Sequence, residues 1–188
     1  MKKLFLLPLM ALMLVGCGEK APEKTEKTVT LTAESLLGAA GSNVAYSKDY
    51  AEKEVDGINF KYQQIGCYYD SKTNQHAGIQ MRNKLADASN GTKSNLFNLS
   101  AFGDGVKSVA FKVTDGKAGY ANANALKVSF AKAADLADAE VQMLSTEKDV
   151  ADYTITPAAQ DQAYLKIEID DAFTFSLYFA QIVVTYIG

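Results

Sequence analysis

The side chains best suited to contact a ligand are gathered in one segment of the sequence. The stretch from Gly66 to Gln80 reads GCYYDSKTNQHAGIQ, and its aromatic and polar members are Tyr68, Tyr69, Asp70, Asn74, Gln75 and His76. Binding sites for small polar molecules combine flat apolar surfaces with a few placed polar groups, often on loops held by a rigid scaffold. The segment therefore predicts a carbohydrate site. Tyrosines are equally common on strand faces, and Asp, Asn and Ser in plain turns, so an ordinary strand connection is the alternative.

His76 is the only histidine of the chain, and it follows Cys67 by nine positions. A cysteine nucleophile needs a nearby base, so the two residues are a conceivable dyad. A lone cysteine beside Ile65 and Tyr68 is more typically a small buried hydrophobic residue, and we prefer this interpretation. One histidine and one internal cysteine are too few for a four-ligand zinc site, and the sequence has no GxSxG or HExxH motif. We therefore predict no catalytic residue and no cofactor, and a protein that is not an enzyme. We assign no metal-ligating residue, because no ordered D-x-D loop is present, although a structural calcium ion stays open.

Two charged features of the sequence could also take part in catalysis or binding. Asp170 and Asp171 are adjacent, and two carboxylates can act together across a substrate. Neighbouring strand residues point to opposite faces, however, so the pair is predicted to form a polar turn before Phe173. Arg82 is the only arginine and projects from a predicted strand, where it would bridge carboxylates or reach a ligand. We count Arg82 among the candidate ligand-binding residues. A second aromatic group, Tyr46 and Tyr50, follows the first predicted strand.

The elements that must position these residues are β-strands. From Thr28 to the end of the chain, apolar and polar residues alternate with a period of two, which places every second side chain on one face of a strand. Turn signals such as Asp56-Gly57 and Gly103-Asp104-Gly105 separate these stretches. The predicted strands include residues 29–31, 58–62, 79–82, 109–113, 126–130 and 165–169. Alternation of this kind is typical of antiparallel sheets with one buried face.

Two stretches depart from this pattern. Apolar residues occupy odd positions in 173–179 and even positions in 182–186, which predicts a bulge near Ala180 and Gln181. In residues 131–144, Leu136, Ala139 and Met143 have helical spacing, which predicts one short helix. About eight to ten short strands joined by glycine turns predict an all-β fold, a two-sheet antiparallel sandwich of jelly-roll type.

Length and composition agree with a single folded domain. The chain has 188 residues, of which 48% are hydrophobic and 22% charged, and these values disfavour wholesale disorder, collagen and coiled coils. The formal net charge is −3, with lysines scattered among the acids. Proteins that bind nucleic acid need clustered cations, so nucleic acid is excluded as a partner.

The N-terminus has the pattern of an export signal. Lys2 and Lys3 precede an apolar run from Leu4 to Val15, which is shorter than the about 20 residues of a membrane-spanning helix. The ending LVGC, which closes on Cys17, resembles the lipobox of bacterial lipoproteins. The resemblance implies cleavage before Cys17 and acylation of that cysteine, which would make the lipid bilayer a partner of the protein. An ordinary secretory signal with an incidental cysteine is the alternative.

This resemblance divides the chain into three regions. Residues 1–16 would be the lipoprotein signal peptide, residues 17–27 the lipidated cysteine and a flexible tether, and residues 28–188 the β-sandwich domain. Removal of Lys2 and Lys3 from the 19 bases leaves 17 against 22 acids, a net charge of −5. Because Gly18 is not the aspartate associated with inner-membrane retention, we expect the outer membrane, with its periplasmic or surface side left open.

The remainder of the chain also resembles a known group of domains. The segments IQMRN, VKSVAFKV, ALKVSF, YTIT and FAQIVVTY are similar to strands of galactose-binding-like jelly rolls in surface lipoproteins of the Bacteroides type, over about Val29 to Ile187. The resemblance implies a non-enzymatic carbohydrate-binding or adhesion module, with glycan as its partner. The alternative is a structural or assembly lipoprotein that binds a cell-envelope protein through a sheet edge or an apolar patch.

Overall fold

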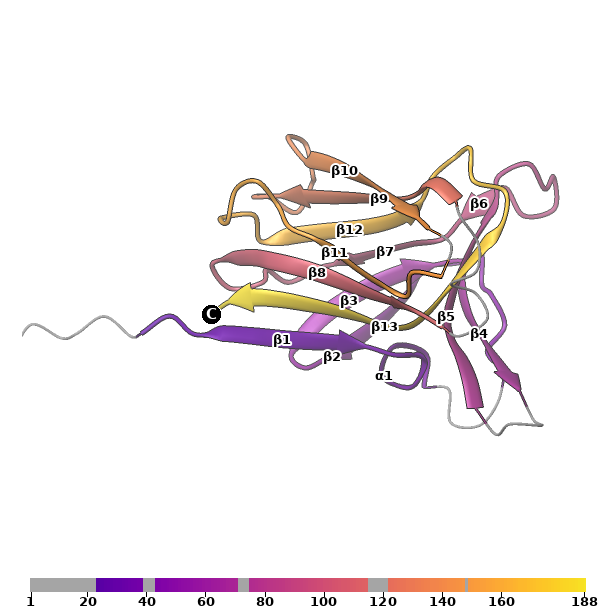
Figure 1. Ribbon diagram of the computed structural model, residues 1–188, viewed down its shortest axis with the longest axis horizontal. Coiled ribbons are helices and arrows are strands. Elements are labelled where there is room, and N and C mark those ends of the chain that lie inside the picture. Colours follow the sequence, from indigo (N-terminus) through magenta and orange to yellow (C-terminus); the bar gives the residue numbers. More distant parts are fainter. Residues whose placement is uncertain (1–22, 39–42, 71–74, 115–121, 148) are drawn as a thin grey trace, which may run out of the picture.

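The computed structural model describes residues 23–38, 43–70, 75–114, 122–147 and 149–188. These residues form two antiparallel sheets and one short helix (Figure 1). Sheet A has the order β11-β8-β13-β5-β4, with β1 also pairing with β13 and β6 with β5. Its strands are β1 (Glu26–Leu31), β4 (Ile65–Asp70), β5 (Gln75–Lys84), β6 (Thr92–Lys93), β8 (Gly105–Val113), β11 (Asp152–Ile155) and β13 (Ser176–Ile187).

Sheet B has the order β10-β9-β12-β7-β3-β2. Its strands are β2 (Ala51–Val55), β3 (Ile58–Gln63), β7 (Asn95–Asn98), β9 (Asn122–Ala131), β10 (Glu140–Thr146) and β12 (Tyr164–Ile169). The chain crosses between the sheets so that β5, β13, β8 and β11 are neighbours in one, and β7, β12, β9 and β10 in the other. This is the jelly-roll order, and it confirms the predicted all-β sandwich.

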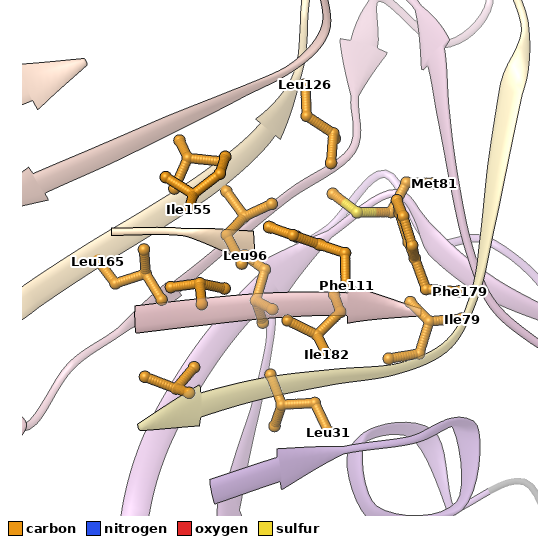
Figure 2. Close-up of a cluster of buried hydrophobic side chains, with 14 of the residues drawn as sticks. Leu31, Ile79, Met81, Leu96, Phe111, Leu126, Ile155, Leu165, Phe179 and Ile182 are labelled. Atoms are coloured by element: carbon orange, nitrogen blue, oxygen red, sulfur yellow. The ribbon is translucent and has the colours of Figure 1, made fainter. Parts of the chain in front are cut away.

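The core lies between the sheets and is built from the inward-facing residues of each strand. On β8 the side chains of Val109, Phe111 and Val113 are buried, whereas Lys112 between the last two is exposed. Figure 2 shows side chains from both sheets meeting in this layer, and the ring centroids of Phe111 and Phe179 are 5.5 Å apart. The main cluster runs from Val29 to Tyr186, so a chain that begins at Glu19 contains the complete core.

The predicted bulge in the last strand is present. The register of β13 against β8 shifts between Phe179 and Gln181, so Ala180 has no partner residue on β8. The buried residues of β13 therefore change from odd to even positions at this point. Gly78 of β5 lies against this point with φ +93, and a Cβ atom added there would stand 2.1 Å from the carbonyl oxygen of Phe179. The bend in β13 thus requires a residue without a side chain on the neighbouring strand.

The prediction of a helix within residues 131–144 is wrong. Residues 132–138 form turns, and β10 then pairs along β9 from Glu140 to Thr146. Leu136 has φ 58, which no α-helix accommodates. From Val141 onward the residues also alternate: Val141 and Met143 are exposed, whereas Leu144 is buried. The alanines lie in the connection between β9 and β10, where the turn that joins the two paired strands overrides their helical propensity.

The single helix among the described residues, α1 (Ala33–Leu37), lies directly after β1. Thr32 caps its N-terminus: the Thr32 hydroxyl accepts from the Ser35 backbone N–H at 3.0 Å, and the Ser35 hydroxyl accepts from the Thr32 N–H at 2.9 Å. Gly38 ends the helix in the left-handed conformation. The signals for this helix were its capping residues, because its five residues are too few to show a period.

Two predicted turns are confirmed. Asp56 and Gly57 both have positive φ, as a tight hairpin between β2 and β3 requires. After β12, the Asp170 carboxylate accepts from the Ala172 N–H at 3.0 Å, and the Phe173 N–H donates to the Asp170 carbonyl at 3.1 Å. The adjacent aspartates thus form a turn, as predicted.

The two ends of the described fold lie together (Figure 1). β1 pairs antiparallel with the final residues of β13, from Glu26 opposite Ile187 to Leu31 opposite Ile182. The ladder is extended by Thr25 and Gly188, which exchange backbone hydrogen bonds of 3.1 and 3.0 Å. Within the described ranges, no helix has the length and apolar character needed to cross a bilayer.

Candidate functional site

Most of the predicted carbohydrate segment lies on the β4–β5 hairpin. Tyr69 is opposite His76 and Asp70 is opposite Gln75, with Tyr68 just before them on β4. Asn74 and the side chains of these five residues lie outside the described part of the structure. A binding site on this hairpin therefore stays a prediction.

Cys67 is buried, with 4% of its surface exposed, and it packs with Ala33 of α1. Burial raises the pKa of the Cys67 thiol, which opposes the thiolate that a nucleophile needs. These features favour the small buried hydrophobic residue that the sequence suggested over a reactive thiol.

Arg82 lies in a stack of side chains on sheet A. Its guanidinium carbon is 3.4 Å from the centroid of the Tyr46 ring, and its Nη2 donates to the Gln64 Oε1 at 3.1 Å. Gln64 is itself buried and donates to the Thr92 hydroxyl at 2.6 Å. Burial raises the pKa of the Tyr46 phenol against the lowering effect of Arg82. The stack holds the 43–50 segment on the sheet, and a ligand-binding role for Arg82 stays a prediction.

The outer face of sheet B carries a second concentration of polar and aromatic groups. The core-facing residues of β12 are Leu165, Ile167 and Ile169, so Lys166 and Glu168 point to the opposite side. Register then fixes their neighbours on the same face: Lys166 lies between Phe97 and Ser129, and Glu168 between Asn95 and Lys127. We call this set the sheet B face. Its members are Lys61, Gln63, Asn95, Phe97, Lys127, Lys166 and Glu168 of sheet B, together with Tyr50, which contacts Phe97, and Lys93 of β6, which contacts Glu168.

An aromatic pair lies on one side of this face. Tyr50, just before β2, is 50% exposed, and its ring meets the ring of Phe97 edge-on, with centroids 6.1 Å apart and planes at 75°. The ammonium of Lys61 lies 5.4 Å from the Tyr50 centroid and 3.3 Å from Glu52. Tyr50 is therefore held in place by Phe97 and Lys61 while half its surface remains open to solvent.

A carboxylate surrounded by lysines lies beside the aromatic pair. The side chain of Glu168 is 6% exposed, with Lys166 at 2.7 Å, Lys127 at 3.3 Å and Lys93 at 3.4 Å. Burial opposes ionisation of Glu168, but the hydrogen bond and charge of Lys166, together with the other two lysines, hold its pKa below the ordinary value. An ionised carboxylate bound to several ammonium groups is poorly suited to proton transfer.

Two amides connect these groups. Asn95 Nδ2 donates to Gln63 Oε1 at 3.1 Å and to the Lys93 carbonyl at 3.2 Å. Asn95 is 5% exposed, and its Oδ1 has no hydrogen-bond partner among the described residues. A buried acceptor of this kind is costly unless a donor reaches it.

The sheet B face offers ring stacking, amide pairing and ammonium groups on rigid strands, which are the means of binding rather than of bond cleavage. No group of three or more His, Cys, Asp or Glu side chains suited to a metal occurs in the described ranges. Sequence reasoning named Tyr50 but missed Phe97, Glu168 and the lysines. The alternation in the sequence shows that these residues point outward from their strands. It does not show the order of the strands in the sheet, which makes them neighbours.

Comparisons with known proteins add little. No family model and no curated protein matches the chain. Among solved structures, a low-affinity xylan-binding module, CBM86, from the xylanolytic gut symbiont Roseburia intestinalis is similar, with a TM-score of 0.35 and 15% identity over 85% of this chain and 94% of that chain. A similarity this distant carries no argument about function.

Proposed function

We propose that this protein is a non-enzymatic, lipid-anchored module that binds carbohydrate on the sheet B face. The observation that carries the proposal is the half-exposed Tyr50 ring, fixed by Phe97 and Lys61 next to the Asn95–Gln63 amide pair. A sugar ring presents an apolar face that stacks on an aromatic side chain and hydroxyls that pair with amides.

The rigidity of the sheet supports this assignment. Phe97 is on a central strand between β3 and β12, and its backbone is fixed by both ladders. A ligand that binds there does not have to order a loop, which lowers the entropic cost of binding. The β4–β5 hairpin remains a second location for the same function, because its aromatic and polar residues are suited to the same chemistry.

Replacement of Tyr50 by alanine is expected to weaken glycan binding about tenfold, because it removes the most exposed stacking surface of the face. The chain from Glu19 would be screened on a glycan array, and each hit titrated by calorimetry with the wild-type and variant proteins. Tyr178→Ala, on the outer side of sheet A, is the matched control and should bind normally. Loss of binding in Tyr69→Ala but not in Tyr50→Ala would move the site to the hairpin. A blank array with folded protein would reject the proposal.

The anchoring part of the proposal has its own test. The lipobox resemblance implies three acyl chains on the new N-terminal Cys17, and these would hold the protein firmly, since each buried methylene contributes about 0.8 kcal/mol to membrane binding. The full chain expressed in a bacterium is expected in the outer-membrane fraction. Cys17→Ser should be missing from that fraction and, if its apolar Leu4–Val15 segment is not removed, should stay in the inner membrane. Density separation of the two membranes, followed by immunoblotting, measures both proteins. A Cys17→Ser protein that still reaches the outer membrane would contradict the lipid anchor.

A protein partner is the second candidate, and one observation favours it. Val141 and Met143 of β10 are 48% and 41% exposed and are adjacent on the outer side of sheet B. Two side chains of β10 contact the 156–158 segment: Gln142 Nε2 donates to the Thr156 carbonyl at 2.8 Å, and the Ala158 N–H donates to Glu140 at 2.9 Å. A partner would contact the two apolar side chains or add a strand to β10, which is an end strand of its sheet.

A further inference from the structure

We infer that the glycan bound on the sheet B face carries an acidic group, a carboxylate or a sulfate ester, and that Lys127 and Lys166 bind it. This inference rests on the proposed carbohydrate function and adds the class of sugar.

The charges are layered with the acid beneath the bases. The Glu168 side chain is 6% exposed, whereas those of Lys127 and Lys166 are 39% and 29% exposed. Glu168 Oε1 is 3.3 Å from Lys127, and its Oε2 is 2.7 Å from Lys166. A ligand that approaches Glu168 therefore meets two ammonium groups first, while the exposed carboxylate of Asp171 lies to the side, against Lys93.

The ammonium groups retain donors for a ligand. Each lysine carries three N–H donors, while Lys127 and Lys166 each have one ion-pair contact, in both cases with Glu168. Lys93 has its own second partner, since it also contacts Asp171 at 2.5 Å. Three ammonium groups, Lys93, Lys127 and Lys166, thus share two carboxylates, Glu168 and Asp171, which leaves one positive charge without an acid. An anionic substituent between the half-buried Lys127 and Lys166 would balance that charge.

The surroundings favour a sugar as the carrier of that charge. Lys166 is directly opposite Phe97 in the ladder, so a ring stacked on the aromatic pair would place its substituents near the ammonium. Asn95 is opposite Glu168 and joins Gln63 to the same face, so polar groups continue from the lysines toward the aromatic pair. The chain as a whole has a net charge of −3, so the protein does not attract polyanions in general. Binding of an acidic sugar would therefore depend on these lysines.

The test compares charged and neutral polysaccharides with the chain from Glu19. The carboxylated probes are polygalacturonate and alginate, the sulfated probe is dextran sulfate, and the neutral probes are dextran and fully methyl-esterified polygalacturonate. We expect acidic probes to bind at least tenfold more tightly than their neutral counterparts, with affinity that falls as salt is raised. The carboxylated and sulfated arms decide which group is recognised.

Lys127→Gln and Lys166→Gln should each weaken binding of the acidic probe about tenfold, whereas Lys112→Gln, an exposed lysine on sheet A, should leave it unchanged. Circular dichroism verifies that each variant is folded. Neutral hits alone would overturn the inference and leave the proposed function standing, whereas the absence of any hit would reject both. Equal affinity for polyglutamate, or acidic binding that both lysine variants retain, would also overturn the inference.

Discussion

Gly78→Ala is expected to reduce the free energy of unfolding by more than about 3 kcal/mol, because the new Cβ would clash with backbone atoms, which cannot move aside as a side chain can. The atom it meets, 2.1 Å away, is the backbone carbonyl oxygen of Phe179, and the carbonyl carbon follows at 2.6 Å. Relief of this clash requires β5 and β13 to separate where β13 bulges. The backbone strain of φ +93 in a residue other than glycine adds to the cost.

Gly91 provides a control that separates backbone strain from crowding. It also has positive φ, +64, but a Cβ there would meet nothing within 4 Å. Gly91→Ala should therefore lose only about 1 kcal/mol. Urea unfolding followed by far-ultraviolet circular dichroism measures both variants, because the chain has no tryptophan to report by fluorescence. Similar losses in the two variants would contradict the close approach of the strands.

Glu168→Ala is expected to lose about 2–4 kcal/mol of stability, the second large effect. Removal of the carboxylate leaves Lys93, Lys127 and Lys166 close together without the acid that joins them. The lysines can turn toward solvent, which keeps the loss below that of a fully buried pair. Glu52→Ala, which breaks the exposed pair with Lys61, is the matched control and should cost no more than about 0.5 kcal/mol.

The loss in Glu168→Ala should depend on pH and salt. The pKa of Glu168 is lower in the folded protein, so its contribution is present above the unfolded value of about 4.3 and disappears as the pH falls through the folded value. The wild-type protein should therefore approach the variant in stability as the pH falls below the unfolded value and through the lower folded one. Added salt should restore Glu168→Ala more than the wild type, because it screens repulsion among the lysines. A difference in unfolding free energy between the wild type and Glu168→Ala that stays constant at all pH values would contradict this account.

The sequence predicted the strands well because local alternation and burial agree. Val109 to Val113 and Leu165 to Ile169 alternate as half-buried strands do, and both are strands with the expected faces buried. Even the bulge near Ala180 was visible, as a change of parity. The failure at 131–144 has the opposite origin: alanine-rich composition favoured a helix locally, while pairing with β9 decided the structure.

The site was less accessible to sequence reasoning than the fold. Phe97, Lys127, Lys166 and Glu168 lie on three different strands, and they become neighbours only through the order β9-β12-β7. A single sequence shows which residues of a strand point outward, but not which strands are adjacent. Residues that crowd together in sequence, such as those of the β4–β5 hairpin, were therefore easier to nominate.

The pairing of β1 with the end of β13 determines how the domain responds to a mechanical load. The Glu26–Leu31 ladder runs along the strand axis, with its hydrogen bonds perpendicular to that axis. Tension applied from the N-terminal side along β1, as between a bound polymer and a membrane, would load these bonds in shear and all at once. A peeling force would break them one by one at much lower tension. The first strand thus makes the domain a mechanical clamp at the point where a tether would join it.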